Sequence, residues 1–402
     1  MATLRPFAAL RPTPDRAASV CSVPYDVVST AEARALAAGN PLSFLHVSRP
    51  EIGLPEGTDP HADLVYETAR RNFETLRREA PLTLEASPSL YVYRLRLGDH
   101  AQTGIAGCCS IDEYDRDLIR KHERTRQDKE DDRTRHMVTL RSQTGPVFLT
   151  YRAVPAIDAL VGEATATPAL FDVTAPDGVV HTLWRAADVA TRRLSELFGE
   201  VPLLYIADGH HRAASASRAR ALLRTDESGS FLSVLFPSDQ LRILAYNRVV
   251  KDLSGRTPAK FLAELKAALP VRDGAPPEPA RRGEVSMYLE GRWHGVRLSP
   301  GGENGRGDTS FLDVSRLQER VLEPLLGIGD VRTDARIDFV GGIRGTAELA
   351  RLVDSGRAAV AFSMHPVSLD DLMAVSDAGG IMPPKSTWFE PKLRDGFLCH
   401  MI

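Results

Sequence analysis

The segment Leu203–Leu223 constrains the fold most strongly, because its sequence predicts a strand, a tight turn and a helix in immediate succession. It reads LLYIADGHHRAASASRARALL. The apolar run Leu203–Ala207 predicts a buried strand, Asp208-Gly209 predicts a turn, and the Ala-rich stretch His210–Leu223 predicts a helix. Strands that lead directly into helices are typical of layered proteins in which helices cover a sheet.

The remainder of the chain also alternates between strand-like and helix-like patterns. We expect strands at Leu90–Leu97, Thr103–Ser110, Pro146–Tyr151, Phe231–Phe236, Arg248–Val250, Ile337–Val340 and Ala358–Ser363. We expect helices at Ala31–Ala38, Asp63–Arg78, Ala187–Phe198, Pro258–Ala268, Val314–Leu322 and Thr346–Ser355. We further expect a hairpin over Val285–Leu298 and a flexible surface loop over Gly301–Gly307.

These elements predict a layered α/β or α+β fold with a mixed sheet. The 402 residues leave room for two or three domains, and the Pro-rich stretch Ala275–Pro279 is typical of a linker or an exposed loop. We therefore divide the chain into an N-terminal region 1–110, a central domain 111–275 that contains the Asp208-Gly209 turn, and a C-terminal region 280–402.

The composition excludes several classes of protein. With 43% hydrophobic and 26% charged residues the chain is of ordinary globular type, and its net charge of −3 provides no overall basic field. We therefore expect neither a nucleic acid nor a membrane as partner. The cysteines at 21, 108, 109 and 399 show no C-x-x-C spacing, which argues against a zinc site or a disulfide framework and favours a reducing cytoplasm. The oligomeric state stays open.

The turn after the Leu203–Ala207 strand concentrates groups that bind anions and transfer protons. Gly209 permits a positive φ or a close backbone approach, and the first amides of the following helix form a ready anion site. Arg212 adds a bidentate donor for phosphate or carboxylate. Asp208 is suited to bind a metal or accept a proton, while His210 and His211 are suited to donate to a phosphoryl oxygen or to act as acid and base.

A purely structural interpretation of this turn is also available. Asp208 would cap the helix, and the two histidines would satisfy buried backbone carbonyls. Two consecutive histidines between an Asp-Gly turn and an arginine are more polar than capping requires, so we favour the functional interpretation. A metal held by both histidines is disfavoured, because consecutive residues of a helix point about 100° apart.

A second candidate segment is the charged run over residues 120–135, RKHERTRQDKEDDRTR. Such a run is usually the solvated face of a helix. It also supplies the mixture that phosphoryl transfer needs, with cations to neutralise charge and a carboxylate to orient the nucleophile or hold Mg²⁺. Its candidate phosphate-binding cations are Lys121, Arg124, Lys129 and Arg133, and its candidate acidic groups are Glu123, Glu130, Asp131 and Asp132.

A third candidate is the segment Met382–Lys392, MPPKSTWFEPK. Lys385, Ser386 and Thr387 resemble the end of a P-loop in residue type, although the glycines of that motif are missing. The alternative is a C-terminal segment that Trp388 and Phe389 anchor. Two further segments are weaker candidates: a cleft-lining loop at Pro24-Tyr25-Asp26 and a ligand-approach turn at Asp338–Gly342.

With these motifs the chain closely resembles the domain-of-unknown-function 1015 family, nearly from end to end. The resemblance rests on Val23–Val27, Ile119–Thr125, Tyr205–Arg212, Arg336–Gly342 and Met382–Lys392. A more distant likeness covers about a tenth of the chain. Gly209–Ser215 looks like the G-x-x-R-x-x-A/S turn of the ParB/sulfiredoxin superfamily, which includes sulfiredoxin, CTP-binding partition proteins and free serine kinases.

Within that superfamily the kinase form Asp-Gly-x-His-Arg is most similar to Asp208–Arg212. The sulfiredoxin cysteine follows the glycine directly, where this chain has His210, and we find no helix-turn-helix of the kind that partition proteins carry. The resemblance therefore implies a ParB/sulfiredoxin-like strand–turn–helix core that holds nucleotide phosphates. It also implies a nucleotide-dependent kinase that converts free L-serine, or another small hydroxylated metabolite, into its phosphate ester.

That model implies ATP or ADP as phosphoryl donor together with Mg²⁺. Gly209 and the helix amides would cradle phosphate, Arg212, His210 and His211 would stabilise charge, and Asp208 would serve as metal ligand or base. Glu123 is the second candidate base. The implied remainder of the phosphate shell is Lys121, His122, Arg124, Thr125, Lys385, Ser386, Thr387 and Lys392. A phosphoserine-type phosphatase and a non-catalytic nucleotide-binding regulator are the alternatives.

Overall fold

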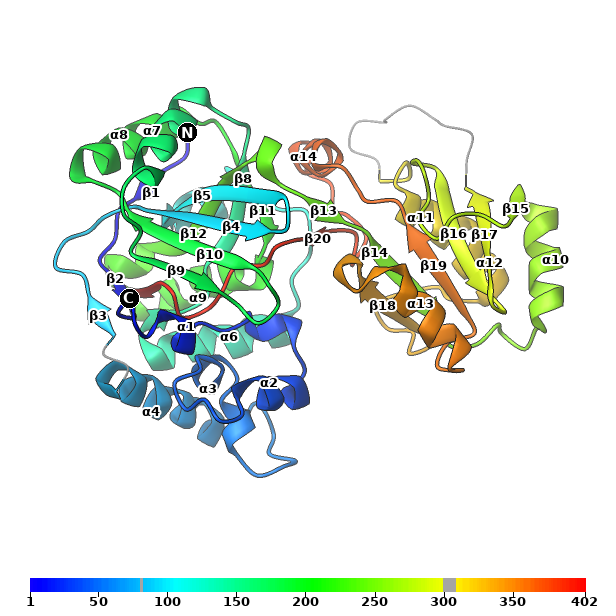
Figure 1. Cartoon of the computed structure of the whole chain (residues 1–402), viewed down its shortest axis with the longest axis horizontal. Coiled ribbons are helices and arrows are strands. Elements are labelled where there is room, and N and C mark those ends of the chain that lie inside the picture. The colour runs from blue at the N-terminus through cyan, green and yellow to red at the C-terminus, as the bar shows by residue number, and fades with distance from the viewer. Residues whose placement is uncertain (80–81, 299–308) are drawn as a thin grey trace. The chain divides into compact units, whose positions relative to one another are not determined.

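The computed structural model describes residues 1–79, 82–298 and 309–402, which form two compact units (Figure 1). Unit 1 consists of Met1–Leu241 together with Pro391–Ile402, and unit 2 consists of Arg242–Glu390. The loop predicted at Gly301–Gly307 lies outside the described residues. In the described ranges no helix is long and apolar enough to cross a membrane.

Unit 1 is built on a mixed sheet, to which nine of the described strands belong (Figure 1). The strands are β1 (Leu4–Arg5), β4 (Tyr91–Leu97), β5 (His100–Ser110), β6 (Ile119–Arg120), β8 (Val147–Tyr151), β9 (Phe171–Thr174), β10 (Val180–Arg185), β11 (Leu204–Asp208) and β12 (Ser230–Pro237). Their order is β6-β11-β8-β12-β5-β4-β10-β9, with β1 on β5. β11 is parallel to β6 but antiparallel to β8, and β12 is parallel to β8.

Helices and a small second sheet complete unit 1. The helices are α1 (Ala17–Val20), α2 (Thr30–Ala37), α3 (Leu45–Ser48), α4 (Asp63–Glu79), α5 (Ile111–Asp115), α6 (Gln127–Leu140), α7 (Pro155–Thr165), α8 (Asp188–Phe198) and α9 (His210–Leu223). The second sheet has the order β3 (Thr83–Leu84), β2 (Ala9–Arg11), β21 (Cys399–Met401) and β7 (Ser142–Gln143). It ties the end of the chain back to unit 1.

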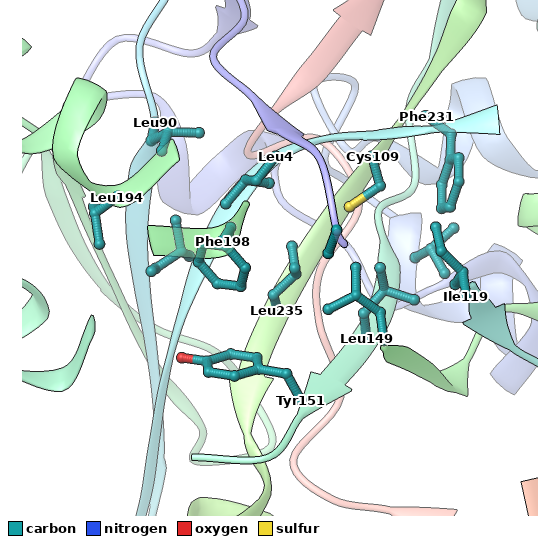
Figure 2. Close-up of a cluster of buried hydrophobic side chains, with 14 of the residues drawn as sticks. Leu4, Leu90, Cys109, Ile119, Leu149, Tyr151, Leu194, Phe198, Phe231 and Leu235 are labelled. Atoms are coloured by element: carbon teal, nitrogen blue, oxygen red, sulfur yellow. The ribbon is translucent and has the colours of Figure 1, made fainter. Parts of the chain in front are cut away.

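One large hydrophobic cluster of unit 1 lies on one face of the large sheet. Because successive side chains of a strand point to opposite faces, alternate residues of β8 such as Leu149 and Tyr151 reach the same layer. Helix α8 places Leu194 and Phe198 against them, and Figure 2 shows these side chains beside Leu235 of β12. Truncating a fully buried Phe198 to alanine would cost about 3–5 kcal/mol. This core fixes the strand ends that carry the site.

Unit 2 contains an antiparallel sheet covered by helices. Its strands, in spatial order, are β15 (Val271–Asp273), β17 (Arg292–Arg297), β16 (Glu284–Leu289), β19 (Val360–Met364), β14 (Tyr246–Val250) and β18 (Ile337–Gly341). A separate pair joins β13 (Ile243–Leu244) to β20 (Trp388–Phe389). The helices are α10 (Pro258–Ala268), α11 (Asp313–Leu317), α12 (Glu323–Leu326), α13 (Gly345–Asp354) and α14 (Leu369–Asp377).

The mixed α/β architecture predicted from the sequence is confirmed, as is the helix His210–Leu223. The strand predicted at Leu203–Ala207 is present as β11, one residue further along the chain at Leu204–Asp208. The structure groups the chain differently from the predicted regions 1–110, 111–275 and 280–402. Strand β5 pairs with β12, so residues on both sides of position 110 share one sheet. Strands β15 and β16 both pair with β17. The Pro-rich stretch Ala275–Pro279, which lies between β15 and β16 in the sequence, therefore connects two strands of one sheet.

Candidate functional site

Two segments that are distant in sequence meet at the edge of the large sheet in unit 1. Strands β6 and β11 are parallel neighbours, with Leu204 opposite Ile119. Because the carboxyl ends of parallel strands lie at the same edge of a sheet, the loop after β6 and the turn after β11 emerge together. The charged loop Lys121–Arg126 therefore lies beside the turn Asp208–Arg212.

Gly209 opens helix α9 in a conformation that suits an anion site. Its φ is 95°, which lies in the left-handed region that residues other than glycine rarely adopt. It is the N-cap residue of α9, and no side chain caps this terminus. The alternative in which Asp208 caps the helix is therefore wrong. The first amides of α9 carry the positive end of the helix dipole, which favours a negatively charged ligand.

Arg212 forms the cationic centre of the site. It is only 3% exposed, and its Nη1 donates to the carbonyl oxygen of Pro146. Its Nη2 lies 3.3 Å from Asp26 Oδ2 and 3.5 Å from Asp208 Oδ2. Its Nε is buried and has no hydrogen-bond partner among the described residues. Burial alone would lower the pKa of Arg212, but the carboxylates of Asp26 and Asp208 raise it, so the side chain stays charged.

Asp208 is held between two cations. Besides Arg212, Lys392 Nζ donates to Asp208 Oδ2 over 3.2 Å. Burial alone would raise the pKa of Asp208, but the charge of Lys392 and that of Arg212 lower it below its usual range. The carboxylate therefore stays ionised at neutral pH and is a weak proton acceptor.

The two consecutive histidines hold the charged loop against the turn. The backbone N–H of His122 donates to His210 Nε2 over 3.4 Å, and that of Arg126 donates to His211 Nε2 over 3.0 Å. Each acceptor nitrogen must be unprotonated, which leaves the ring proton on Nδ1. His210 Nδ1 lies 3.9 Å from Glu123 Oε2, so its N–H faces that carboxylate.

The histidines of the site are neutral near physiological pH. Burial lowers the pKa of His122 to about 4, and it lowers the pKa of His210 well below the usual value, with a further contribution from His122. Burial also lowers the pKa of His211. These rings can therefore offer hydrogen bonds to a phosphoryl group but contribute no positive charge.

The other predicted residues of the charged loop have different surroundings. Glu123 is about half exposed at 43% and lies at the mouth of the site beside His210. Lys121 Nζ donates to the carbonyl oxygen of Tyr114 over 2.7 Å and lies 3.5 Å from Asp117. The Thr125 hydroxyl donates to Glu130.

Arg124 is exposed. The roles predicted for Lys121, Arg124 and Thr125 in phosphate binding stay predictions.

Two further carboxyl groups, those of Asp26 and Asp395, complete the cluster, and only Asp26 lies in a segment that the sequence indicated. Asp26 belongs to the Pro24-Tyr25-Asp26 segment, which the sequence indicated only as a cleft-lining loop. Asp395 was not predicted, since it lies just beyond the Met382–Lys392 motif in the stretch LRDGFL, which matches no motif. It is 2% exposed, and burial raises its pKa to about 7 against the lowering effect of Arg212.

The predicted third segment divides between the two units. Lys392 lies in unit 1, whereas Lys385, Ser386 and Thr387 lie in unit 2. Ser386 donates to the Pro383 carbonyl over 2.6 Å, and the Lys385 ammonium lies 5.4 Å from the centre of the Tyr246 ring. Their part in phosphate binding stays a prediction.

The glycines of Asp338–Gly342 have a packing explanation. A Cβ at Gly341 would lie 2.7 Å from the Trp388 ring, and one at Gly342 would lie 2.6 Å from the Ala245 carbonyl oxygen. Both positions therefore require glycine to let neighbouring groups approach, and no ligand is needed to account for them.

The sequence matches the family model described as protein of unknown function (DUF1015) over residues 4–315. The chain belongs to this family. The family match contains Asp26, Glu123 and the whole turn Asp208–Arg212, whereas Lys392 and Asp395 lie beyond it. Among curated proteins, none matches the sequence.

Solved structures resemble the chain at low identity. A free serine kinase variant in complex with AMP has a TM-score of 0.38 at 16% identity, covering 71% of this chain and 86% of that one. C-terminally truncated SbnI from Staphylococcus aureus has a TM-score of 0.38 at 13%, covering 72% and 85%. A conserved hypothetical protein from Pyrococcus furiosus has 0.36 at 16%, covering 72% and 93%. These similarities are too low to assign an activity.

The metal role predicted for Asp208 finds little support in the donor set. In the part of the chain that the structure describes, no group of three or more His, Cys, Asp or Glu side chains could hold a metal ion. Asp208 itself is occupied by Lys392 and Arg212. The described residues do not fit a metal site built from protein ligands alone.

Proposed function

We propose that this protein is a nucleotide-dependent phosphotransferase that phosphorylates the hydroxyl group of a small metabolite, with free L-serine as the first acceptor to test. The observation that carries the proposal is the combination at the start of α9. An uncapped helix terminus on a left-handed Gly209 adjoins the buried guanidinium of Arg212, whose Nε has no partner among the described residues.

This combination suits the terminal phosphates of ATP or ADP. The amides of the first helical turn and the Arg212 Nε–H are all hydrogen-bond donors. No protein side chain caps the amides and no described group accepts from Nε, so these donors can bind phosphate oxygens. Lys392 adds a second cation next to Asp208. The neutral ring of His210 adds a hydrogen-bond donor without a charge that would have to be desolvated.

Glu123 is a better general base than Asp208 in this scheme. A catalytic base works best when its pKa is near the working pH, and the two cations at Asp208 hold the pKa of that carboxyl below its usual range. The acceptor oxygen would attack the terminal phosphorus while the bond from phosphorus to the bridging oxygen breaks. The hydroxyl proton would pass to the Glu123 carboxylate, and the shortened nucleotide would leave with the bridging oxygen.

We derive no step through Mg²⁺, because the described carboxylates do not form a site for it. A metal ion that takes part would have to enter bound to the nucleotide phosphates, as Mg²⁺ commonly does. Comparing turnover with and without EDTA measures this contribution separately from nucleotide binding.

The test is an assay for O-phosphoserine after incubation of the purified chain with L-serine and either ATP or ADP. Glu123→Gln is expected to reduce kcat by about 10²–10⁴-fold while nucleotide affinity changes little, because only proton transfer is lost. Glu163→Gln, an exposed carboxylate on α7, is the matched control. If neither ATP nor ADP yields O-phosphoserine, the proposed kinase activity is wrong. If Glu123→Gln keeps full activity, Glu123 is not the general base.

A non-catalytic nucleotide-binding regulator is the second candidate. It is favoured by the pairing of Asp208 with two cations, since an ion-pair network of this kind also occurs where no chemistry takes place. Tight nucleotide binding without product would identify it. Release of phosphate from O-phosphoserine in the absence of nucleotide would instead identify a phosphatase.

A further inference from the structure

Glu123 lies in a short loop that is attached to unit 1 on both sides of it. The backbone N–H groups of His122 and Arg126 donate to the two histidines that open α9. A further contact lies between them, where the Thr125 hydroxyl donates to the Glu130 carboxylate on α6. The loop is therefore held against α9 by its backbone and against α6 by a side chain.

Glu130 connects this loop to α9. Its Oε1 accepts from the Thr125 hydroxyl, and its Oε2 lies 3.2 Å from Nη1 of Arg218 on α9. Its backbone carbonyl oxygen accepts from the Ser215 hydroxyl of α9 over 3.1 Å. One residue thus contacts the loop with one carboxylate oxygen, and α9 with the other oxygen and with its backbone.

The position of Glu130 along α9 is fixed by a second contact between the two helices. The Thr134 hydroxyl of α6 lies 3.5 Å from the carbonyl oxygen of Ser215, which is fully buried. Residues 130 and 134 lie one turn apart on the same face of α6, and both meet Ser215. The Glu130 carboxylate therefore extends from a rigid support next to the helix that forms the phosphate cradle.

The contacts of Glu130 require two acceptor oxygens. Thr125 and Arg218 both act as donors, and an ionised glutamate accepts from both. A glutamine has one acceptor and one donor on its amide, so it could satisfy only one of the two. The Glu130 side chain is 19% exposed, and that of Arg218 is 39% exposed. Ion pairs so close to solvent add little to the stability of a fold, so stability alone is a weak reason for this arrangement.

We propose that Glu130 is a positioning residue of the phosphotransferase, which holds the Glu123 carboxylate at the phosphate cradle through Thr125. The proposal rests on the proposed function, since Glu123 is the base of that reaction. A base must lie within hydrogen-bond reach of the hydroxyl whose proton it accepts, and a misplacement of about 1 Å costs on the order of 10²-fold in rate. Glu123 belongs to a partly exposed loop, where side chains are placed less precisely than on helices, so it needs such support.

The first test is Glu130→Gln in the assay for O-phosphoserine. Its kcat is expected to fall by about 10–100-fold, because the base is displaced. Nucleotide affinity, measured by calorimetry, should stay unchanged, because Arg212 and the first amides of α9 are not altered. Asp112→Asn is the matched control, since Asp112 pairs with Arg220 of the same helix and does not belong to the loop. Full activity of Glu130→Gln, or an equal loss in the control, would overturn the proposal.

The second test changes the other partner of the contact. Thr125→Val removes the hydroxyl at nearly constant volume and should reduce kcat as much as Glu130→Gln does, whereas Thr125→Ser keeps the hydroxyl and should retain most of the activity. These variants also provide the measurement if Glu130→Gln does not fold. If Thr125→Val weakens nucleotide binding and leaves kcat unchanged, Thr125 binds phosphate and the positioning role is wrong.

A double variant shows whether Glu130 acts through Glu123. In a chain that already carries Glu123→Gln, the further change Glu130→Gln should reduce kcat no more, because there is no base left to position. Independent losses that multiply in the double variant would contradict the proposal, since Glu130 would then act on the site by another route.

Hydrogen exchange separates this proposal from the kinase. Exchange of the backbone amides of His122 and Arg126 should be faster in Glu130→Gln and Thr125→Val than in the unmodified chain, and unchanged in Asp112→Asn. If the amides respond in this way but the unmodified chain never forms O-phosphoserine, the attachment of the loop is supported and the kinase is wrong. If O-phosphoserine forms and neither variant changes the exchange, the kinase is supported and the positioning role is wrong.

Discussion

Each of the two units buries an arginine beneath a segment that the sequence predicted to bind phosphate, and the two arginines have opposite surroundings. Arg212 of unit 1 has carboxylates at 3.3 and 3.5 Å, which raise its pKa. Among the described residues, Arg248 of unit 2 donates to the backbone carbonyls of Tyr246 and Lys385 and forms no ion pair, and burial lowers its pKa to about 10.

The difference separates a charge network from a structural clamp. At Arg212 several ionised groups meet and one donor remains unsatisfied, which is the arrangement that a charged ligand requires. At Arg248 the guanidinium supports the turn around Lys385, whose φ of 57° is unusual for a residue other than glycine. The residue types alone did not distinguish the charge network around Arg212 from the structural clamp around Arg248.

The largest expected effect comes from removing the two arginines in turn. Arg212→Met should destabilise unit 1 by about 3–5 kcal/mol and abolish nucleotide binding, because Asp26 and Asp208 lose a buried partner. Arg248→Met should cost only about 1–2 kcal/mol, because two hydrogen bonds are lost but no carboxylate is left unpaired. Urea unfolding and calorimetric nucleotide titration measure both. Similar losses of nucleotide affinity in the two variants would break the comparison.

The pH dependence of stability should depend on Asp395. Its pKa is raised to about 7 in the folded state, whereas an unfolded aspartate has a pKa of about 3.9. Between these values the folded chain binds the proton more tightly, so this group's contribution to stability falls as pH rises from about 4 to about 7 and is constant above that. The difference in unfolding free energy between the unmodified chain and Asp395→Asn, measured at each pH, isolates the contribution of this carboxyl. That difference should change by a few kcal/mol at most across the window. A difference that does not vary over this window would contradict a raised pKa of Asp395 in the folded chain.

Two glycines test the backbone requirement in the two units. Gly209→Ala forces a side chain into the left-handed region and should cost about 1–3 kcal/mol, with a further loss of phosphate affinity because the helix terminus shifts. Gly341→Ala should cost a similar amount, about 1–3 kcal/mol, through overlap with the Trp388 ring, but should leave phosphate affinity unchanged. Thermal unfolding with and without nucleotide separates the two effects. Loss of nucleotide binding in Gly341→Ala would extend the site to unit 2.

The smallest effect is expected from the two lysines of the third segment. Lys392→Met should weaken nucleotide binding by about tenfold, since it removes a cation that adjoins Asp208. Lys385→Met should change affinity by about twofold or less, since its ammonium lies over Tyr246 in unit 2. A loss at Lys385 equal to that at Lys392 would support the prediction that Lys385, Ser386 and Thr387 bind phosphate.

The sequence predicted the strand, turn and helix of the site because these depend on local signals. An apolar run, an Asp-Gly turn and an Ala-rich stretch can each be recognised from neighbouring residues, and the predicted helix bounds His210–Leu223 are those of the structure. Helix α7 was missed because its first turn has no polar cap, since Pro155 follows Val154 directly. The β9 and β10 hairpin was missed because β9 has only four residues, of which two are apolar.

The charged partners could not be predicted, because they depend on contacts between distant residues. Asp26 meets Arg212 across 186 positions, and Lys392 meets Asp208 across 184. Within the run over residues 120–135, nothing in the sequence separates Arg133, whose side chain is 12% exposed, from the exposed Arg124. The histidines His210 and His211 were predicted as phosphate partners. In the structure they also accept hydrogen bonds from backbone N–H groups of the neighbouring loop, which could not be predicted because these contacts depend on the parallel pairing of β6 and β11.

The return of the chain to unit 1 after unit 2 has a consequence for biosynthesis. The turn at Asp208 is translated well before Lys392 and Asp395, because the whole of Arg242–Glu390 lies between them. A nascent chain can therefore complete most of the large sheet while Asp208 still lacks its second cation. A message truncated within unit 2 would yield a product without Lys392, Asp395 and β21, so that only full-length translation delivers a complete ligand site.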